Sequence, residues 1–161
     1  MGNLFVRTDD RFIHGQVTTG WARKIGARRI ALVNDGIAQD ALIQKLQKLS
    51  AGPGVEVEFL TQEAAVYRIR EGDLGEERLF LLVEAPADLV PLVQAGLELK
   101  EVNLGNLRYE PGRKKIANWL FVDDKQIQAL QALSDLGIRL TAQWMIGQES
   151  INVNEWLARN S

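Results

Sequence analysis

Strand-like and helix-like segments alternate from one end of this chain to the other, and no other feature limits its possible folds as strongly. The strand-like segments span residues 4–6, 29–33, 55–59, 79–83, 101–104, 116–122 and 138–143. The helix-like segments span residues 17–24, 37–49 and 86–95, begin near Thr61 and Asp123, and include a short one after Asn152 or Asn154. Such alternation implies right-handed crossovers between parallel strands. The sequence therefore predicts an α/β fold: an open, mainly parallel twisted sheet with helices on both faces.

Helical periodicity is clearest in two of these segments. In the first, apolar residues follow helical spacing at Leu42, Ile43, Leu46 and Leu49. In the second, which Asp123 or Asp124 caps and Gly137 ends, the residues expected to face inward are Ile127, Leu130 and Leu133. Thr61 is a good N-cap, and Pro86 suits a first helical turn.

Length and composition fit one ordinary domain, which we expect to span residues 1–161. That length suffices to bury a core without disulfides, and the chain has no cysteine. No apolar run approaches the roughly 18 residues that cross a bilayer. The net charge of −2 argues against a general nucleic-acid binder. The absence of cysteine is compatible with the cytoplasm.

The only histidine, His14, lies in the segment Arg7–Gln16, just past the first strand-like run. No other side chain here has an ordinary pKa near neutrality. Two arginines, two aspartates and a glycine surround it: Arg7, Arg11, Asp9, Asp10 and Gly15. Ligands of parallel sheets bind beyond the carboxyl ends of the strands, where helix N-termini favour anions. His14 is therefore a candidate to carry an anion.

Other chemistries lack their sequence signatures. The chain has no glycine-rich phosphate loop, no His/Cys metal spacing, and no nucleophile turn that would place Thr18 or Thr19 in a triad. Two interpretations of His14 stay open at this point. Its imidazole either accepts and passes on a phosphoryl group, or is a buried structural side chain bonded to Asp9 or Asp10.

Basic residues gather in two stretches of the chain. Residues 1–30 contain six of them against Asp9 and Asp10, and the stretch Arg108–Lys115 contains four against Glu110. Each stretch alone fits a solvated surface. Beside an anion site, the two stretches would instead attract a negatively charged partner.

The segment Arg7–Val17, followed by Trp21, closely resembles the phosphorylation-site motif of the IIB components of the mannose/fructose/sorbose class of bacterial sugar phosphotransferase systems. The likeness covers nearly the whole chain in collinear order, through Val33-Asn34-Asp35, Ala38 and Asp40, Asn103-Leu104-Gly105, and Gly137, Leu140 and Gln143. Two loops depart from the pattern of the family. Asn106 stands where many relatives have a glycine, and Trp144–Gly147 replaces a proline-containing turn.

The resemblance implies roles for the residues of the motif. His14 would be phosphorylated at Nδ1. Asp9 would orient Arg11 or the imidazole, with Asp10 as the second candidate for that role. Arg7 would either form a structural ion pair or touch the phosphate. The guanidinium of Arg11 and the backbone N–H groups of Gly15 and Gln16 would hold the phosphate. Neither a metal nor an organic cofactor is implied.

The resemblance also implies a function as a cytoplasmic phosphoryl carrier, a phosphotransferase. It would accept phosphate from a phosphohistidine of a IIA component and pass it to a sugar entering through IIC/IID membrane proteins. Those proteins would hold it at the inner face of the cell membrane, and a homodimer is a further candidate assembly.

Two alternatives stay open: a regulatory phosphoprotein with the same histidine but no transport partner, and a module in which Arg7 and Arg11 bind an acidic ligand. Trp144 is expected to be a docking anchor, a core residue or a dimer contact, and Trp21 and Trp119 are expected in the core.

Overall fold

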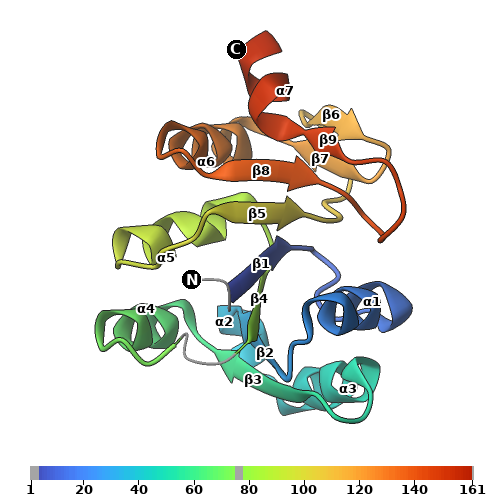
Figure 1. Cartoon of the computed structure of the whole chain (residues 1–161), viewed down its shortest axis with the longest axis vertical. Helices are drawn as coiled ribbons and strands as arrows, with labels where there is room; N and C mark the ends of the chain where they lie inside the picture. Colours follow the sequence, from blue (N-terminus) through green and yellow to red (C-terminus); the bar gives the residue numbers. More distant parts are fainter. Residues whose placement is uncertain (1–3, 75–77, 161) are drawn as a thin grey trace.

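A seven-stranded sheet forms the centre of the computed structural model, which describes residues 4–74 and 78–160 (Figure 1). Its strands are β1 (Leu4–Thr8), β2 (Arg29–Val33), β3 (Glu56–Leu60), β4 (Leu79–Val83), β5 (Glu101–Leu104), β8 (Arg139–Ala142) and β9 (Ile151–Asn152). Their order is β3-β2-β4-β1-β5-β8-β9, and every neighbouring pair is parallel except β8 and β9. The predicted mainly parallel α/β sheet is confirmed.

Helices cover both faces of this sheet. One face carries α1 (Gly15–Ile25) and α3 (Ala41–Ala51), and the other carries α4 (Gln62–Arg70), α5 (Val90–Gln94) and α6 (Asp124–Asp135) (Figure 1). The last helix, α7 (Val153–Arg159), packs against β8 and α6. The remaining elements are α2 (Asp35–Ala38), the 3-10 helix η1 (Pro86–Leu89), and a hairpin of β6 (Lys114–Ala117) and β7 (Leu120–Val122).

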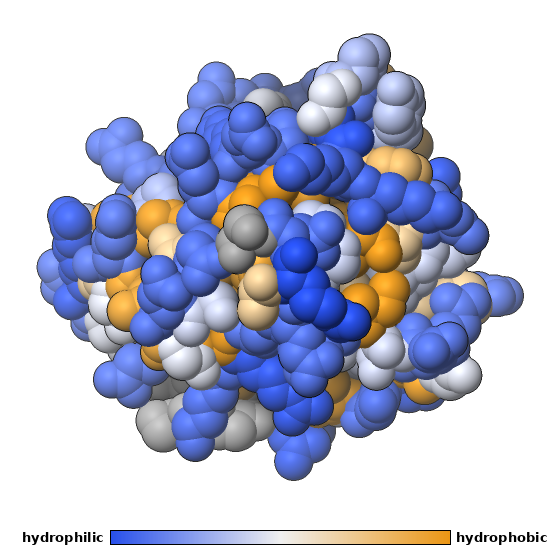
Figure 2. All heavy atoms as spheres, turned by 90° about the horizontal axis from the view of Figure 1, so that it is seen from above, coloured by the Kyte–Doolittle hydropathy of each residue, from blue (hydrophilic) through white to orange (hydrophobic). Residues whose placement is uncertain are grey.

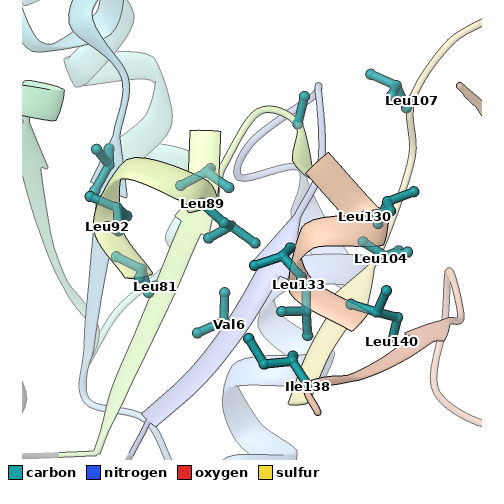
Figure 3. Close-up of a cluster of buried hydrophobic side chains, with 14 of the residues drawn as sticks. Val6, Leu81, Leu89, Leu92, Leu104, Leu107, Leu130, Leu133, Ile138 and Leu140 are labelled. Carbon is teal, nitrogen blue, oxygen red and sulfur yellow. The ribbon is translucent and has the colours of Figure 1, made fainter. Parts of the chain in front are cut away.

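Alternating strand side chains fill two apolar cores, one on each face of the sheet. In β1, Val6 joins the core shared with α4, α5 and α6, where leucines of the strands meet those of α6 (Figure 3). Phe5 points to the opposite core and stacks on Trp21 of α1, with ring centroids 5.5 Å apart. Successive side chains of a strand alternate between faces. Arg7 therefore shares the face of Phe5, and its guanidinium also lies over the Trp21 ring, 5.4 Å from the centroid.

Most predicted helix boundaries are confirmed by their caps. The side chains of Thr61, Asp123 and Asn152 each accept a backbone N–H of the first turn of the helix that follows. Gly137, with φ of 83°, follows the end of α6. Of the three α6 residues expected to face inward, Leu130 and Leu133 are buried and Ile127 is partly buried.

Three predicted elements differ in detail. The helix expected over residues 37–49 is divided into α2 and α3, because Asp40 has extended backbone and caps α3 through the Ile43 N–H. The strand expected over residues 116–122 is the β6–β7 hairpin, which turns at residues 118–119. The helix expected over residues 86–95 begins as η1 and continues as α5. Pro91 lacks the N–H that one continuous helix would need there.

The chain leaves β1 and β5 in opposite directions across the sheet. From β1 it passes to β2, and from β5 to β8 on the other side. A reversal of this kind opens a crevice between the loops at the carboxyl ends of the two strands. Here those loops are residues 9–14, which include His14, and residues 105–108.

Candidate phosphoryl-transfer site

The loop of residues 9–14 carries His14 from the end of β1 to the start of α1, where His14 occupies the N-cap position. Backbone hydrogen bonds fix both sides of the loop: Asp9 N–H donates to Val83 O, and Asp10 N–H donates to Asn106 O, each at 2.9 Å. The predicted position of His14, beyond the first strand and before a helix N-terminus, is confirmed.

Asp9 connects the charged residues of this loop. Its carboxylate is buried, and its Oδ2 lies 2.9 Å from Nε2 of His14 and 3.1 Å from the guanidinium of Arg7. Its Oδ1 accepts the backbone N–H of Arg11 at 3.0 Å. The imidazole is 19 % exposed, and within residues 4–74 and 78–160 its Nδ1 has no hydrogen-bond partner. A neutral His14 that donates Nε2–H to Asp9 thus keeps the Nδ1 lone pair available.

Arg7 is a buried structural cation. Its guanidinium donates to the side chain of Asn103, to the carbonyl oxygens of Gln143 and Trp144 at 3.0 Å each, and to Asp9. Burial lowers the pKa of Arg7, and the Asp9 carboxylate opposes that shift. These contacts engage both terminal nitrogens of the guanidinium, so Arg7 holds Asp9 in place through the same Oδ2 that contacts His14.

Gly105 lets this buried cation fit. A Cβ at position 105 would lie 2.7 Å from Thr8 O and equally close to the Arg7 guanidinium carbon. The Gly105 N–H donates to the same Thr8 oxygen at 2.7 Å. Any larger residue here would push β5 away from β1 or displace Arg7.

The predicted phosphate-binding groups lie at the exposed end of α1. Arg11 is exposed, and in the described part of the chain only its backbone N–H has a hydrogen-bond partner. Gly15 and Gln16 are exposed at the first turn of α1, and Gly15 has φ of 56°. The first N–H groups of a helix have no partner within it, so they and the helix dipole favour a bound anion.

Asp10 makes its contacts away from His14. Its carboxylate accepts the side-chain amide of Asn106 at 2.5 Å and the backbone N–H of Arg108 at 2.9 Å. The Arg108 guanidinium lies 3.6 Å from the same carboxylate. Asp9, rather than Asp10, is therefore the carboxylate bonded to the imidazole, and Asp10 ties the loop after β5 to the loop that carries His14.

Three further residues shape this loop and were not predicted from the sequence. Phe12 adopts φ of 60°, a conformation that a bulky residue rarely takes and that marks a constrained site. Buried Thr18 accepts the His14 N–H at 3.0 Å and donates to Phe12 O at 3.3 Å. Gln47 of α3 accepts the Ile13 N–H at 2.8 Å. Thr18 could have been found from its spacing of four residues after His14, whereas nothing local singles out Gln47.

Several basic residues of the two stretches lie along α1 or pair with other groups. Arg23 lies nine residues after His14, about 14 Å along α1, and Lys24 lies over the Trp21 ring. Arg113 pairs with Glu110 at 2.8 Å and with Asp123 at 3.5 Å. Arg11 of the first stretch and Arg108 of the second both line a hollow beside the loop of residues 9–14.

The tryptophans occupy structural positions. Trp21 is buried, and Trp119 packs partly buried against the core of the α6 face. The Trp144 carbonyl accepts from Arg7 and from the Trp21 indole N–H, at 3.0 Å each. Its own indole nitrogen is buried without a partner among the described residues. The loop after β8 is thereby fastened to β1 and α1.

Glu84 adds negative charge after β4. Burial raises the pKa of Glu84 above the ordinary carboxyl value, and the charges of Asp88 and Asp10 raise it further, while Arg108 opposes them. The folded state therefore holds this proton more tightly than the unfolded state. Stability falls as the pH rises from the ordinary carboxyl pKa through the raised one.

We expect Glu84→Gln to raise the midpoint of thermal unfolding at pH 7 and to leave it nearly unchanged at about pH 3.5, where the carboxyl is protonated. The amide oxygen of glutamine can still accept the Asn34 side chain, which contacts Glu84 at 3.4 Å. Glu149→Gln, in an exposed loop, is the control and should change little at either pH. A lower midpoint for Glu84→Gln at pH 7 would contradict this account.

Within residues 4–74 and 78–160, no group of three or more His, Cys, Asp or Glu side chains is arranged to hold a metal ion. In that same part of the chain, no helix has the length and apolar character needed to cross a membrane. The face seen in Figure 2 is mainly hydrophilic, with apolar patches between polar side chains.

Known proteins are similar to this chain in both sequence and fold. The family described as "PTS system sorbose subfamily IIB component" matches residues 3–161. The sorbose-specific EIIB component of Klebsiella pneumoniae is 33% identical over 147 residues, which cover 91% of this chain and 90% of that protein. The mannose-specific EIIAB component of Escherichia coli (strain K12) is 34% identical over 134 residues, 83% of this chain and 42% of that longer protein.

A solved structure agrees with these matches. The crystal structure of the IIBSor domain of the sorbose permease from Klebsiella pneumoniae superposes with a TM-score of 0.90 and 30% identity. The superposition covers 99% of this chain and 98% of that one. The chain therefore belongs to the sorbose-subfamily IIB components of the phosphotransferase system, and its general role is phosphoryl transfer in sugar transport.

Proposed function

We propose that this chain carries a phosphoryl group on Nδ1 of His14, accepting it from a phosphohistidine of a IIA component and passing it to a sugar. One observation carries the proposal: buried Asp9 occupies Nε2 of the imidazole, and Nδ1, at the N-terminus of α1, has no partner among the described residues. The same geometry favours this function over a structural histidine, because the imidazole is 19 % exposed and lies at an anion-favouring helix end.

The transfer follows from these contacts. The Nδ1 lone pair of neutral His14 attacks phosphorus in line, the bond from phosphorus to the donor histidine nitrogen breaks, and His14 becomes a phosphorylated imidazolium. The Asp9 carboxylate stabilises that positive charge through Nε2–H. In the second step a sugar hydroxyl attacks, the bond from Nδ1 to phosphorus breaks, and the hydroxyl proton is released to solvent.

Arg11 and the first N–H groups of α1, at Gly15 and Gln16, would balance the charge on the equatorial phosphoryl oxygens. Arg11 suits this role because its guanidinium is exposed and has no partner among the described residues. Arg7 does not share the role, because it is buried and both terminal nitrogens of its guanidinium are already bonded inside the protein.

Arg11→Lys should therefore slow phosphoryl transfer although it keeps the charge, because a compact ammonium cannot form two parallel hydrogen bonds to a phosphoryl group. Loss of one charge-assisted hydrogen bond, roughly 1–3 kcal/mol, corresponds to about a ten- to hundredfold lower rate. Rapid-quench measurement with phosphorylated IIA donor gives the rate, and exposed Arg139→Lys is the control. A rate within twofold of wild type would show that Arg11 does not contact the phosphoryl group.

We infer that residues 1–161 act as one IIB domain beside IIC/IID membrane proteins, peripheral to the inner face of the cell membrane. The relatives are named for different sugars, sorbose and mannose, and several classes of hexose are therefore candidate acceptors. A purely regulatory phosphoprotein would have no such membrane partner.

The proposal is tested by incubating the purified chain with phosphorylated IIA donor and then with membranes containing the permease and a labelled sugar. We expect label from the donor on the chain first and on the sugar second. If membranes from the same cells are supplied and phosphate reaches the chain but no sugar, the result would favour a regulatory phosphoprotein. Absence of any phosphate on the chain would favour an acidic-ligand module.

A further inference from the structure

A hollow of about 450 Å³ lies beside the loop that carries His14, at the crevice between the carboxyl ends of β1 and β5. One wall is formed by the two loops that meet there, through Asp10, Arg11, Asn106 and Arg108. The other wall belongs to the β6–β7 hairpin and the segment before it. The volume falls within the range of small-molecule sites, about 300–1,000 Å³. The transfer chemistry at His14 requires only Arg11 of these residues.

Two guanidinium groups line the loop wall. The backbone of Arg108 is fixed to the nearly buried Asp10 carboxylate at 2.9 Å, and the Arg108 side chain is 66 % exposed. Asn106 donates its amide to the other oxygen of Asp10, and the Arg108 guanidinium lies 3.6 Å from the carboxylate, so these groups offset its negative charge. Paired arginines with fixed bases suit a phosphate monoester, which accepts several charge-assisted hydrogen bonds.

The hairpin wall has a different character. Tyr109 and Phe121 meet edge to face, with ring centroids 5.5 Å apart and planes at 84°, and Trp119 and the exposed Asn118 lie at the turn of the hairpin. Aromatic faces accept the C–H groups of a sugar ring, and a side-chain amide both donates to and accepts from hydroxyls. The aromatic faces would not improve binding of a bare phosphate ion.

We propose that this hollow binds the phosphorylated sugar, a hexose phosphate, with its phosphate between Arg11 and Arg108 and its ring against Tyr109, Trp119 and Asn118. The inference rests on the proposed function, since His14 would supply the phosphate. It deepens that function by placing part of the sugar recognition on this chain, at the end of the transfer step.

Calorimetric titration of the unphosphorylated chain tests the proposal with three kinds of probe: hexose phosphates (mannose 6-phosphate, fructose 1-phosphate and sorbose 1-phosphate), the free hexoses, and inorganic phosphate. We expect at least one hexose phosphate to bind about tenfold or more tightly than inorganic phosphate or its own free hexose. That ratio corresponds to one charge-assisted hydrogen bond or one ring contact of good geometry.

Two exposed substitutions separate the two walls. Arg108→Gln should weaken hexose phosphate and inorganic phosphate alike, by about tenfold, and Arg139→Gln is its control, with a side chain 73 % exposed. Tyr109→Ala should weaken hexose phosphate by about three- to tenfold and leave inorganic phosphate unchanged. Tyr67→Ala is its control, because Tyr67 is 63% exposed and Tyr109 62%.

Three results would overturn the inference: equal affinity for inorganic phosphate and every hexose phosphate, which leaves an anion site only; no effect of Tyr109→Ala; or no binding of any hexose phosphate. If Tyr109→Ala slows phosphorylation by the IIA donor and leaves hexose phosphate affinity unchanged, the hollow is a contact surface for the donor protein and does not bind the sugar. The titration needs no phosphoryl donor, so its result does not depend on whether His14 is phosphorylated. If His14 accepts no phosphate, the proposed function is refuted, and the binding of hexose phosphate is still measured separately.

Discussion

His14→Ala should fold normally and accept no phosphate from a IIA donor. The imidazole is the only one in the chain, and no other described side chain combines a free nucleophilic nitrogen with the α1 N-terminus. The variant loses one hydrogen bond to Asp9, whose carboxylate keeps the Arg7 guanidinium and the Arg11 N–H. That loss costs about 1 kcal/mol, or roughly 2–4 °C in the unfolding midpoint.

The measurement is intact-protein mass spectrometry after incubation with phosphorylated donor, beside circular dichroism and thermal unfolding. Thr19→Ala is a suitable control, because Thr19 lies in the same helix and its hydroxyl, among the described residues, bonds only to Gly15 O. It should accept phosphate at the wild-type level. Phosphate on His14→Ala would show that another residue is the acceptor.

Arg7→Met should destabilise the fold severely. It removes four hydrogen bonds, to Asn103, Gln143, Trp144 and Asp9, and leaves the Asp9 carboxylate buried without its cation. Breaking a buried ion pair by deleting one partner costs about 3–5 kcal/mol. For a domain of this size the unfolding midpoint should fall by roughly 6–20 °C.

Arg139→Met provides the comparison, because the Arg139 pair with Glu101 is long, at 3.8 Å, and exposed. It should shift stability by no more than about 0.5 kcal/mol. A midpoint for Arg7→Met within 2 °C of wild type would mean that the Arg7 network is not what holds the site together.

The fold and the position of His14 could be predicted from the sequence because both depend on local signals. These signals are short apolar runs, turns, and capping residues such as Thr61 and Asp123. Each acts on its own segment, so it can be recognised in a single sequence. The position of His14 followed from the rule that parallel strands present their carboxyl ends at one edge. The family resemblance supplied the roles of the motif residues, and those roles stay predictions until tested.

Features that depend on distant parts of the chain could not be predicted. Asp9 contacts His14, whereas Asp10 bonds to Asn106 and Arg108, which lie nearly a hundred residues away in the sequence. Arg7 is buried by contacts with Asn103 and Trp144, which are distant in the sequence. The sequence alone therefore left two roles open for Arg7, a structural ion pair or a phosphate contact. Helical spacing was also insufficient for α3, where Leu42 (67%), Leu46 (51%) and Leu49 (71%) are exposed instead of packed.

The most direct test of the account is to locate the phosphate on the wild-type chain. Mass spectrometry of peptides after incubation with phosphorylated IIA donor identifies the residue, and ¹⁵N–¹H NMR of the imidazole in the intact protein identifies the nitrogen. We expect phosphate on His14 alone, at Nδ1, with a proton on Nε2 held by Asp9. Phosphate on any other residue, or on Nε2 of His14, would contradict it.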